Sequence, residues 1–382
     1  MKVRLGDYIQ EYSVKNKDDE NISVYSVTNT KGFCKDYFGK EVASKDKTTY
    51  KIVPYGYFAY NPSRINVGSV DWQRKEKKVI VSPLYNVFSV SPNLERQYLY
   101  YYLKSDFVLQ RIKAVATGSV RDNLKLSMLY EFPIELPKLE NQRKIVKILD
   151  KVSDVIEKKE QELEQLETLV KSRFVELFGD PIKNPKGWEV VKLSECLERI
   201  DNGKSFTCDS NAREGVFPAI LKLSAATYGD YRPYENKALL DEKQFVESVE
   251  VHRGDLLFTR KNTPDLVGMA AYVFETPEKL MMPDLIFRLV TNERMTPTFL
   301  WQLINNREFR PAIQGISGGS AKSMSNISKE RLKNIEVICP PISVQKKLEG
   351  VLEQVDKSKS KIQKSLEETQ RLFDSLMQKY FG

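Results

Sequence analysis

Residues 137–179 of the chain read PKLENQRKIVKILDKVSDVIEKKEQELEQLETLVKSRFVELFG, and residues 340–382 read PPISVQKKLEGVLEQVDKSKSKIQKSLEETQRLFDSLMQKYFG. The two stretches align without a gap at a constant offset of 203 residues, and both end in Phe-Gly. Identical residues include Pro137/Pro340, Gln142/Gln345, Leu149/Leu352, Leu163/Leu366 and Leu169/Leu372. Because the match also preserves the spacing of the apolar residues, the chain contains an internal repeat that decides its architecture.

Each copy of the repeat predicts one long helix. Residues 139–177 lack Gly and Pro, and Pro137 stands just before them, where a helix tolerates proline. Apolar residues recur with the seven-residue spacing of a coiled coil. In the first copy they are Ile145, Leu149, Val152, Ile156, Leu163, Leu166, Val170 and Leu177, interrupted by Lys159 and Arg173. In the second copy they are Leu348, Leu352, Val355, Ile362, Leu366, Phe373, Leu376 and Tyr380, interrupted by Lys359 and Thr369. Two unconnected surface helices are the alternative, but two stripes of equal length most economically bury each other.

The order of the segments predicts how these helices run. Weaker sequence similarity precedes each copy, for example between Val53-x-x-Gly56 and Val251-x-x-Gly254. A related globular part is therefore expected before each helix. If the globular parts lie at opposite ends of the first helix, the second helix must run back antiparallel to it. At ~1.5 Å per residue, the 39 residues of the first helix give a rod of roughly 58 Å.

The fold class that we expect is α+β. Two globular mixed α/β domains are separated by two long helices that form an antiparallel coiled coil, and the whole is a pseudo-twofold internal repeat. The expected segments are residues 1–138, 139–178, 179–340 and 341–382. Apolar runs predict strands at residues 22–27, 57–60, 79–81, 87–90 and 285–290, and short helices are predicted at residues 95–105 and 298–306.

Composition excludes several classes of chemistry. The single histidine, His252, nearly excludes His-based triads, His-metal sites and histidine proton shuttles. The four cysteines are scattered without a C-x-x-C pair, so we expect reduced thiols rather than zinc ligands or disulfides. The sequence has neither a run of ~20 apolar residues that could span a bilayer nor a hydrophobic signal core. We therefore expect a soluble, cytoplasmic protein with no membrane partner.

Catalytic motifs are also missing from the sequence. Residues 315–323 have Ala321 where a phosphate-binding loop needs its second glycine. The pair Asn61-Pro62 lacks the second proline and the aromatic residue of a DNA methyltransferase loop that holds a flipped base. The pair Pro283-Asp284 lacks the downstream partners of a nuclease site. We therefore expect a binding protein with no catalytic residue and no metal site.

Positive charge is unevenly distributed along the chain, whose formal net charge is +8. Residues 1–138 hold 22 basic and 15 acidic side chains, whereas residues 178–341 hold 22 of each. A basic first half permits, but does not require, contact with a polyanion such as nucleic acid.

Basic and polar side chains interleaved with aromatic ones are candidate DNA contacts. A solvated loop is the alternative for each single lysine, but as sets beside polar turns these residues favour phosphate and base contacts. In the first half they are Lys31, Lys35, Lys40, Lys45, Asn61, Arg64, Asn66, Arg74, Lys75, Ser119 and Arg121. In the second half they are Asn202, Lys204, Ser205, Lys222, Tyr228, Arg260, Lys261, Asn262, Ser320 and Lys322.

Apolar residues beside the helix seams predict a protein partner. On a two-helix rod they would stay partly wet, whereas partner helices that complete a four-helix bundle would cover them. These residues are Ile148, Val155, Leu169, Val351 and Leu372.

The ends of the repeats carry a recognisable pattern. It comprises residues 132–145 (FPIELPKLENQRKI), residues 177–193 (LFGDPIKNPKGWEVVKL) and residues 335–345 (IEVICPPISVQ). In these segments, and over essentially the whole chain, the sequence resembles the specificity (S) subunit of type I restriction-modification enzymes.

This resemblance implies a function. Each globular half is then a target recognition domain that reads one half of a split, asymmetric DNA sequence. The two helices act as a ruler for the spacer and dock two modification subunits, which bind S-adenosylmethionine and methylate adenine. Restriction subunits driven by ATP, with Mg²⁺, complete the endonuclease, and no cofactor is expected in this chain. The rival hypothesis is a non-catalytic coiled-coil scaffold that binds protein or RNA, and an enzymatic role ranks third.

Overall fold

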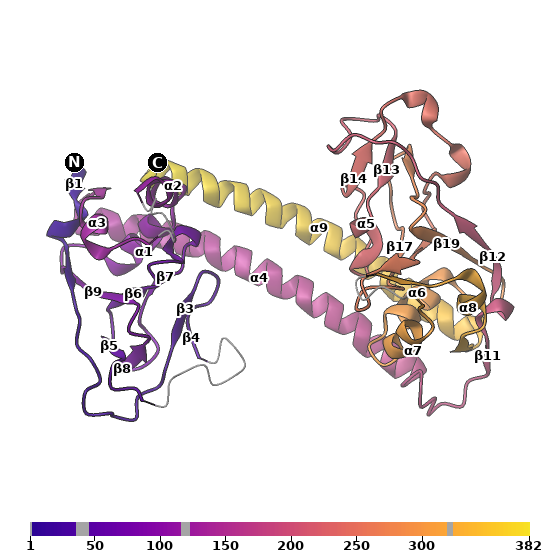
Figure 1. The fold of residues 1–382 in the computed structure, drawn as a ribbon, viewed down its shortest axis with the longest axis horizontal. Helices are drawn as coiled ribbons and strands as arrows, with labels where there is room; N and C mark the ends of the chain where they lie inside the picture. Colours follow the sequence, from indigo (N-terminus) through magenta and orange to yellow (C-terminus); the bar gives the residue numbers. More distant parts are fainter. Residues whose placement is uncertain (1, 36–45, 116–122, 319–323) are drawn as a thin grey trace. The chain divides into compact units, whose positions relative to one another are not determined.

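The structure is a computed structural model, and it describes residues 2–35, 46–115, 123–318 and 324–382. The chain forms two compact units (Figure 1). Unit 1 comprises residues 1–160 and 364–382, and unit 2 comprises residues 161–363. Both unit boundaries fall inside the long helices, so the four segments expected from the sequence stay a prediction.

Unit 1 is built on a four-stranded antiparallel sheet in the order β2-β9-β6-β7. These strands are β2 (Ile9–Glu11), β6 (Phe58–Tyr60), β7 (Val70–Trp72) and β9 (Asn86–Val90). The further strand pairs are β1 (Lys2–Arg4) with β10 (Pro133–Glu135), β3 (Ser26–Thr28) with β4 (Gly32–Cys34), and β5 (Lys51–Pro54) with β8 (Lys78–Val81). The short helices are η1 (Leu5–Asp7), η2 (Ile65–Val67), α1 (Arg96–Lys104), α2 (Asp106–Val115) and α3 (Leu126–Tyr130). Phe58 and Phe88 of the sheet share one core with Leu99 of α1.

Unit 2 repeats this plan, with a sheet in the order β12-β19-β15-β17. These strands are β12 (Leu197–Asn202), β15 (Leu256–Thr259), β17 (Ala270–Tyr272) and β19 (Ile286–Thr291). The counterparts of the other shared elements are β11 (Val190–Lys192), β21 (Glu336–Ile338), η3 (Leu193–Glu195), α6 (Pro297–Asn305), α7 (Arg310–Gly315) and α8 (Lys329–Lys333). The remaining elements are β13 (Ala219–Leu221), β14 (Asn236–Ala238), β16 (Lys261–Asn262), β18 (Leu280–Met281), β20 (Ser325–Asn326), α5 (Ser224–Thr227), η4 (Glu242–Gln244) and η5 (Glu247–Val249). The shared sheet order means that the repeat extends beyond the helices into both globular parts.

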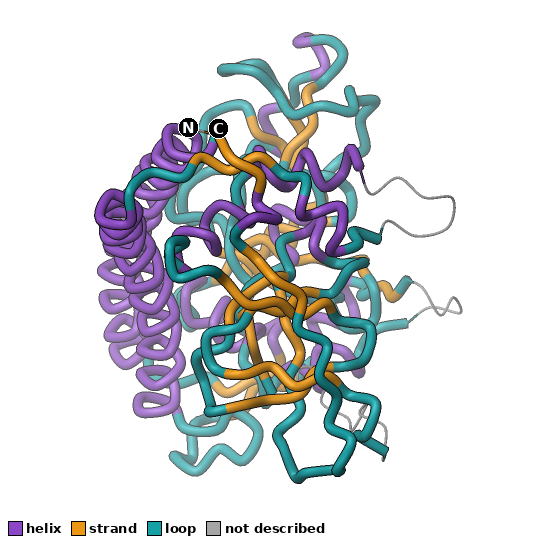
Figure 2. Tube along the Cα trace, turned by 90° about the vertical axis from the view of Figure 1, so that its left-hand side faces the viewer, coloured by secondary structure: helices purple, strands orange, loops and turns teal. Residues whose placement is uncertain are grey.

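The two long helices are α4 (Leu139–Phe178) and α9 (Ile342–Phe381), and in each unit they pack side by side (Figures 1 and 2). In unit 1, Leu149 near the start of α4 shares a core with Phe381 at the end of α9. In unit 2, Phe174 near the end of α4 shares a core with Leu348 near the start of α9. The helices therefore run antiparallel, as the sequence predicts.

Two lysines that interrupt the heptad pattern have partners on the opposite helix. Lys159 Nζ donates to Ser365 Oγ at 2.6 Å in unit 1. Lys359 Nζ forms an ion pair with Glu167 at 3.3 Å in unit 2. Polar pairs at single seam positions favour one register over others, because a shifted register leaves them unpaired. These interruptions thus specify the antiparallel alignment.

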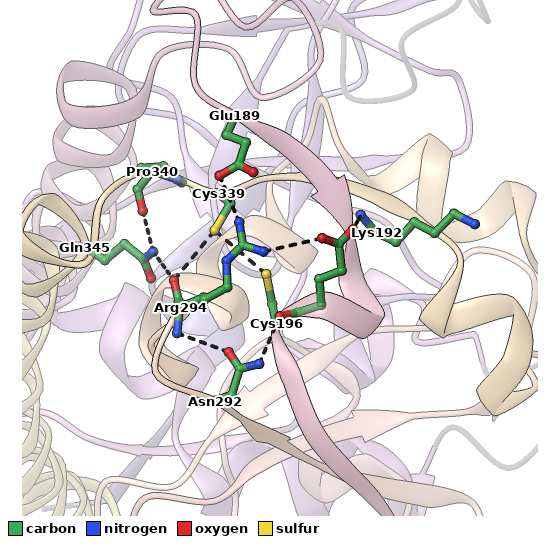
Figure 3. Close-up of polar contacts among 9 residues, drawn as sticks. Glu189, Lys192, Cys196, Asn292, Arg294, Cys339, Pro340 and Gln345 are labelled. Atoms are coloured by element: carbon green, nitrogen blue, oxygen red, sulfur yellow. Dashed lines mark hydrogen bonds and ion pairs between the residues drawn. The ribbon is translucent and has the colours of Figure 1, made fainter.

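A buried glutamine anchors α9 to unit 2. Gln345 Oε1 accepts a hydrogen bond from the backbone N–H of Thr296 at 2.8 Å. Its Nε2 donates to the carbonyl oxygens of Arg294 (2.9 Å) and Pro340 (2.7 Å), and Figure 3 shows the side chain pointing at both. The amide side chain therefore satisfies three backbone groups where the helix leaves the globular part.

The same anchor occurs in unit 1 with Gln142, at the start of α4. It accepts from the N–H of Glu95 at 2.8 Å and donates to the carbonyls of Asn93 and Pro137. Both glutamines are fully buried. The repeat therefore preserves a complete set of buried hydrogen bonds, which explains why these positions match in the two copies.

Most of the predicted short elements are present, and one is wrong. The helices predicted at residues 95–105 and 298–306 are α1 and α6, with Glu95 and Thr296 as N-caps. The strand predicted at residues 22–27 is limited to its last two residues, because β3 begins only at Ser26. Val24 makes a single bridge to Ile80, whereas β3 pairs with β4, so this segment changes partners and no continuous ladder forms.

Candidate nucleic-acid interface

In unit 2, two of the predicted contact segments meet at the start of β19. Asn202, the last residue of β12, pairs with Phe287, and the N–H of Lys204 donates to the carbonyl of Met282. On the neighbouring side, the N–H of Arg260 donates to the carbonyl of Leu285. Asn202, Lys204 and Ser205 are exposed, and Arg260 and Lys261 are half-buried. The segments around Asn202 and Arg260, almost 60 residues apart in sequence, thus place polar side chains near the start of β19.

Arg260 is held in place by neutral groups. Its guanidinium lies 5.0 Å from the ring centroid of Phe287 and within 3.4 Å of Asn326 Oδ1. Its carbonyl accepts a hydrogen bond from the N–H of Ile327 at 2.8 Å. The segment after β15 is therefore fixed to residues 325–327. The predicted contacts Ser320 and Lys322 lie outside the described residues.

Three other predicted residues of unit 2 have contacts within the unit. Asn262 is 7% exposed, and its Nδ2 donates to Thr227 Oγ1 at 3.2 Å, so it supports α5. Tyr228, directly after α5, is exposed and stacks with the guanidinium of Arg232 at 4.6 Å. Lys222 forms an ion pair with Glu235 at 3.7 Å. Of this group, Tyr228 is the side chain most available to an outside partner.

In unit 1, the turn after β6 occupies the corresponding place. Asn61 Oδ1 accepts from the N–H and the hydroxyl of Ser63, so Asn61 shapes the turn. Arg64 is exposed, and Asn66 is half-buried in η2. The N–H of Leu124 donates to the carbonyl of Pro62 at 3.1 Å, which matches the bond from Ile327 to Arg260 in unit 2. The predicted contacts Ser119 and Arg121 lie outside the described residues.

The remaining predicted cations of unit 1 lie around the β3–β4 hairpin and after β7. Lys31 is exposed in the hairpin turn, and Lys75 is exposed after β7. Lys35 forms an ion pair with Glu76 at 2.8 Å, and this interaction raises the pKa of the lysine. Lys40 and Lys45 lie outside the described residues.

Arg74 neutralises a buried carboxylate. It lies 3.2 Å from Asp71, and its guanidinium stacks on Trp72 at 4.7 Å. Burial raises the pKa of Asp71, whereas the charge of Arg74 and the backbone N–H groups of Trp72 and Phe33 lower it. Part of the charge of Arg74 is therefore used inside the unit, and Lys75 is the freer cation of the two.

The apolar residues predicted to bind a partner are exposed on the long helices, with one exception. The exposed fractions are 42% for Ile148, 43% for Val155, 46% for Leu169 and 51% for Leu372. Val351 differs, because it is partly buried and packs against the core of unit 2. Each unit thus exposes apolar side chains on at least one of its helix segments, a feature typical of docking surfaces.

Sequence reasoning did not select two cations of α8, Lys329 and Arg331. Lys329 lies against the ring of Phe287, as Arg260 does, and Arg331 lies against Gly318. In the described part of the chain, no three His, Cys, Asp or Glu side chains gather in a way that could hold a metal ion. None of the helices described is both long and apolar enough to cross a membrane.

Comparison with known proteins identifies the family. The profile of the type I restriction modification DNA specificity domain matches residues 3–168 and, a second time, residues 185–369. The chain belongs to this family. The two matches of the DNA specificity domain cover both sheets of repeated order, so the duplication seen in the structure is a duplication of this domain.

Relatives in the family are specificity subunits. The chain is 30% identical over 203 residues to the EcoEI specificity subunit of Escherichia coli, an alignment that covers 51% of this chain and 34% of that protein. It is 24% identical over 378 residues to the MjaVIII specificity subunit of Methanocaldococcus jannaschii, which covers 93% of this chain and 85% of that protein. The chain thus spans about a third of the length of the first relative and most of the second.

Two solved structures share the fold. The type I restriction-modification S subunit from M. genitalium has a TM-score of 0.62 and 15% identity, covering 100% of this chain and 96% of that one. A chain from a study of complex assembly and conformational transition of the type I system has a TM-score of 0.53 and 19% identity, covering 100% and 97%. At these identities the similarity concerns the fold, and it confirms the predicted α+β architecture.

Proposed function

We propose that this chain is the DNA-recognition subunit of a type I restriction-modification complex, in which each unit reads one half of a split, asymmetric target. The observation that carries this proposal is the double match of the DNA specificity domain to two units with one sheet order. The side chains differ at corresponding places, such as the exposed Ser63 in unit 1 and the half-buried Lys261 in unit 2. A duplicated scaffold with different surfaces suits two different half-sites.

The residues that we assign to DNA contact lie on the turns that follow the sheet strands. In unit 1 these are Arg64 and the exposed lysines Lys31 and Lys75. In unit 2 they are Asn202, Lys204 and Arg260. Phosphate contacts from lysine and arginine position a protein on the duplex, and amide or guanidinium contacts to base edges select the sequence. Both kinds of side chain are present in each unit.

The chemistry of the complex belongs to its partners in this proposal. The exposed apolar side chains of α4 and α9 dock two modification subunits, which bind S-adenosylmethionine and methylate adenine. Restriction subunits that use ATP and Mg²⁺ join them, and this chain directs both activities without catalysing either. Such a complex works in the cytoplasm.

Selection from a random DNA library tests the proposal. The chain is co-expressed with its modification subunits, and the purified complex is incubated with duplexes that carry a randomised segment. We expect enrichment of one bipartite motif with a fixed, unspecified spacer. A complex of the modification subunits alone is the control, and it should enrich no motif. Retention of RNA or protein with no preference among duplexes would favour the scaffold hypothesis.

A further inference from the structure

Four cations gather around one edge of unit 2, although its globular part has no net charge. Arg260 and Lys329 both lie against the ring of Phe287, at 5.0 and 5.6 Å from its centroid. Lys261 follows Arg260, and β16 pairs it with Asn326 of β20. Arg331 lies two residues after Lys329 on α8. We refer to Arg260, Lys261, Lys329 and Arg331 as the basic cluster.

The neighbours that hold the basic cluster are neutral. Lys329 Nζ donates to the carbonyl of Ile200. Two nitrogens of the Arg260 guanidinium donate to the same acceptor, Asn326 Oδ1. The guanidinium of Arg331 lies where a side chain at position 318 would stand, so it packs on the backbone of Gly318. Within the described residues, none of the four cations forms an ion pair with a carboxylate. Arg260, Lys329 and Arg331 are therefore held by neutral groups, and within the described residues all four positive charges lack an ion-pair partner.

A shallow hollow opens beside Arg331. It has a volume of about 610 Å³, and Ser317, Gly318 and Asn334 contribute to its wall. Glu330 is the single acidic residue among those that line it. Backbone and amide groups next to a guanidinium suit an anion with several oxygen acceptors, such as a phosphate group.

The basic cluster has no counterpart in unit 1. The hydrogen bond from the N–H of Leu124 to the carbonyl of Pro62 in unit 1 corresponds to the one from Ile327 to Arg260 in unit 2, so these positions match in the repeat. Helices α3 and α8 begin at matching positions of the repeat. The residues of unit 1 that correspond to Arg260, Lys261, Lys329 and Arg331 are Pro62, Ser63, Leu126 and Met128. Unit 2 thus carries basic residues at four positions where unit 1 has none.

We propose that the basic cluster is a phosphate clamp, with which unit 2 grips the backbone of duplex DNA independently of base sequence. This inference rests on the proposed function and adds to it a division of labour. The clamp holds the duplex, while the exposed polar residues Asn202 and Tyr228 face the bases. It also explains how a globular part with equal numbers of acidic and basic residues can hold a polyanion.

The salt dependence of DNA binding measures the clamp directly. Each phosphate neutralised by a cation contributes about 0.9 to the slope of log affinity against log salt concentration. Lys329→Gln combined with Arg331→Gln should lower that slope by about 1.8. Between about 50 and 200 mM salt, the wild-type complex should then lose about 12-fold more affinity than the variant. The enriched bipartite motif should stay the same, because phosphates carry no base information.

The measurement uses the chain assembled with its modification subunits and fluorescent duplexes with and without the selected motif. Lys183→Gln is the matched control, because it removes one exposed cation from the linker between α4 and β11. Lys261→Gln is a second test variant, since its side chain makes no hydrogen bond within the described residues, and it should lower the slope by about 0.9. This variant decides the question if the double variant unfolds or fails to assemble.

The outcomes separate the clamp from the proposed function. A wild-type complex that binds no duplex removes the proposed function and the clamp together. If the wild type binds and the cluster variants keep its salt slope, the clamp is wrong and the proposed function stands. A variant that changes the enriched motif assigns the cluster to base recognition and also overturns the clamp.

Discussion

Replacing Gln345 with leucine tests whether the repeated glutamine anchors hold the long helices to the globular parts. The side chain is fully buried and makes three hydrogen bonds with backbone groups of Thr296, Arg294 and Pro340. Leucine has a similar size but cannot make any of them. The N–H of Thr296 and the carbonyl of Pro340 then lie in the interior without a partner.

The expected loss of stability follows from those orphaned groups. A buried donor or acceptor left without a partner costs about 1–3 kcal/mol. Two such groups, partly relieved by rearrangement, give a loss of about 3 kcal/mol in the free energy of unfolding. For a unit of roughly 200 residues, the melting temperature falls by about 2–4 °C per kcal/mol, so a decrease of about 6–12 °C is expected.

Urea and thermal unfolding, followed by tryptophan fluorescence, measure this loss. Trp188 and Trp301 lie in unit 2 and report on it. Gln354→Leu is the matched control, because Gln354 is exposed on the same helix, and it should change the stability by less than about 0.5 kcal/mol. Equal stability of the Gln345 and Gln354 variants would refute the argument that the anchor is essential.

Three further predictions concern the helices and the thiols. Val155→Glu with Leu169→Glu places charges on exposed apolar positions of α4, so co-purification with the modification subunits should be lost. The control Lys158→Glu, at an exposed position of the same helix, should keep it. Stoichiometric binding by the double variant would contradict the docking surface. Deleting one heptad from each long helix shortens the helices by ~10.5 Å, about three base pairs, so the DNA spacer should shorten or recognition should fail, and an unchanged spacer contradicts the ruler hypothesis. Burial and the neighbouring Cys339 raise the pKa of Cys196 to about 12, so its thiolate fraction increases tenfold per pH unit but stays near 10⁻⁴ at about pH 8. Iodoacetamide should therefore modify Cys196 at least about 100 times more slowly in the folded protein than in urea, as followed by mass spectrometry, and equal rates would show that the thiol is exposed.

The long helices were predictable because their signal is local. A seven-residue apolar spacing depends only on the geometry of one helix, so α4 and α9 could be located within about a residue. Lys159 and Lys359 looked like defects of that pattern, yet each has a polar partner on the opposite helix. Sequence spacing identified the interruptions but not their partners, since pairing depends on the register of the second helix.

The candidate interface was predictable only in part, because its residues come together through tertiary contacts. Lys329 and Arg331 are separated from Arg260 by about 70 residues, and no local pattern connects them. Asn262 is polar and looked available, but its amide is buried against Thr227. Arg74 was placed correctly near aromatic residues, whereas its ion pair with the buried Asp71 could be found only in the structure.

The proposed function requires that two related units of one chain read the two halves of a split DNA target. Single-molecule sequencing of methyl-adenine tests it most directly, in cells that express this chain together with its modification subunits. We expect methylation at one bipartite, asymmetric motif with a spacer of fixed length, and none when this chain is left out. Methylation at a single continuous motif, or methylation that does not depend on this chain, would contradict it.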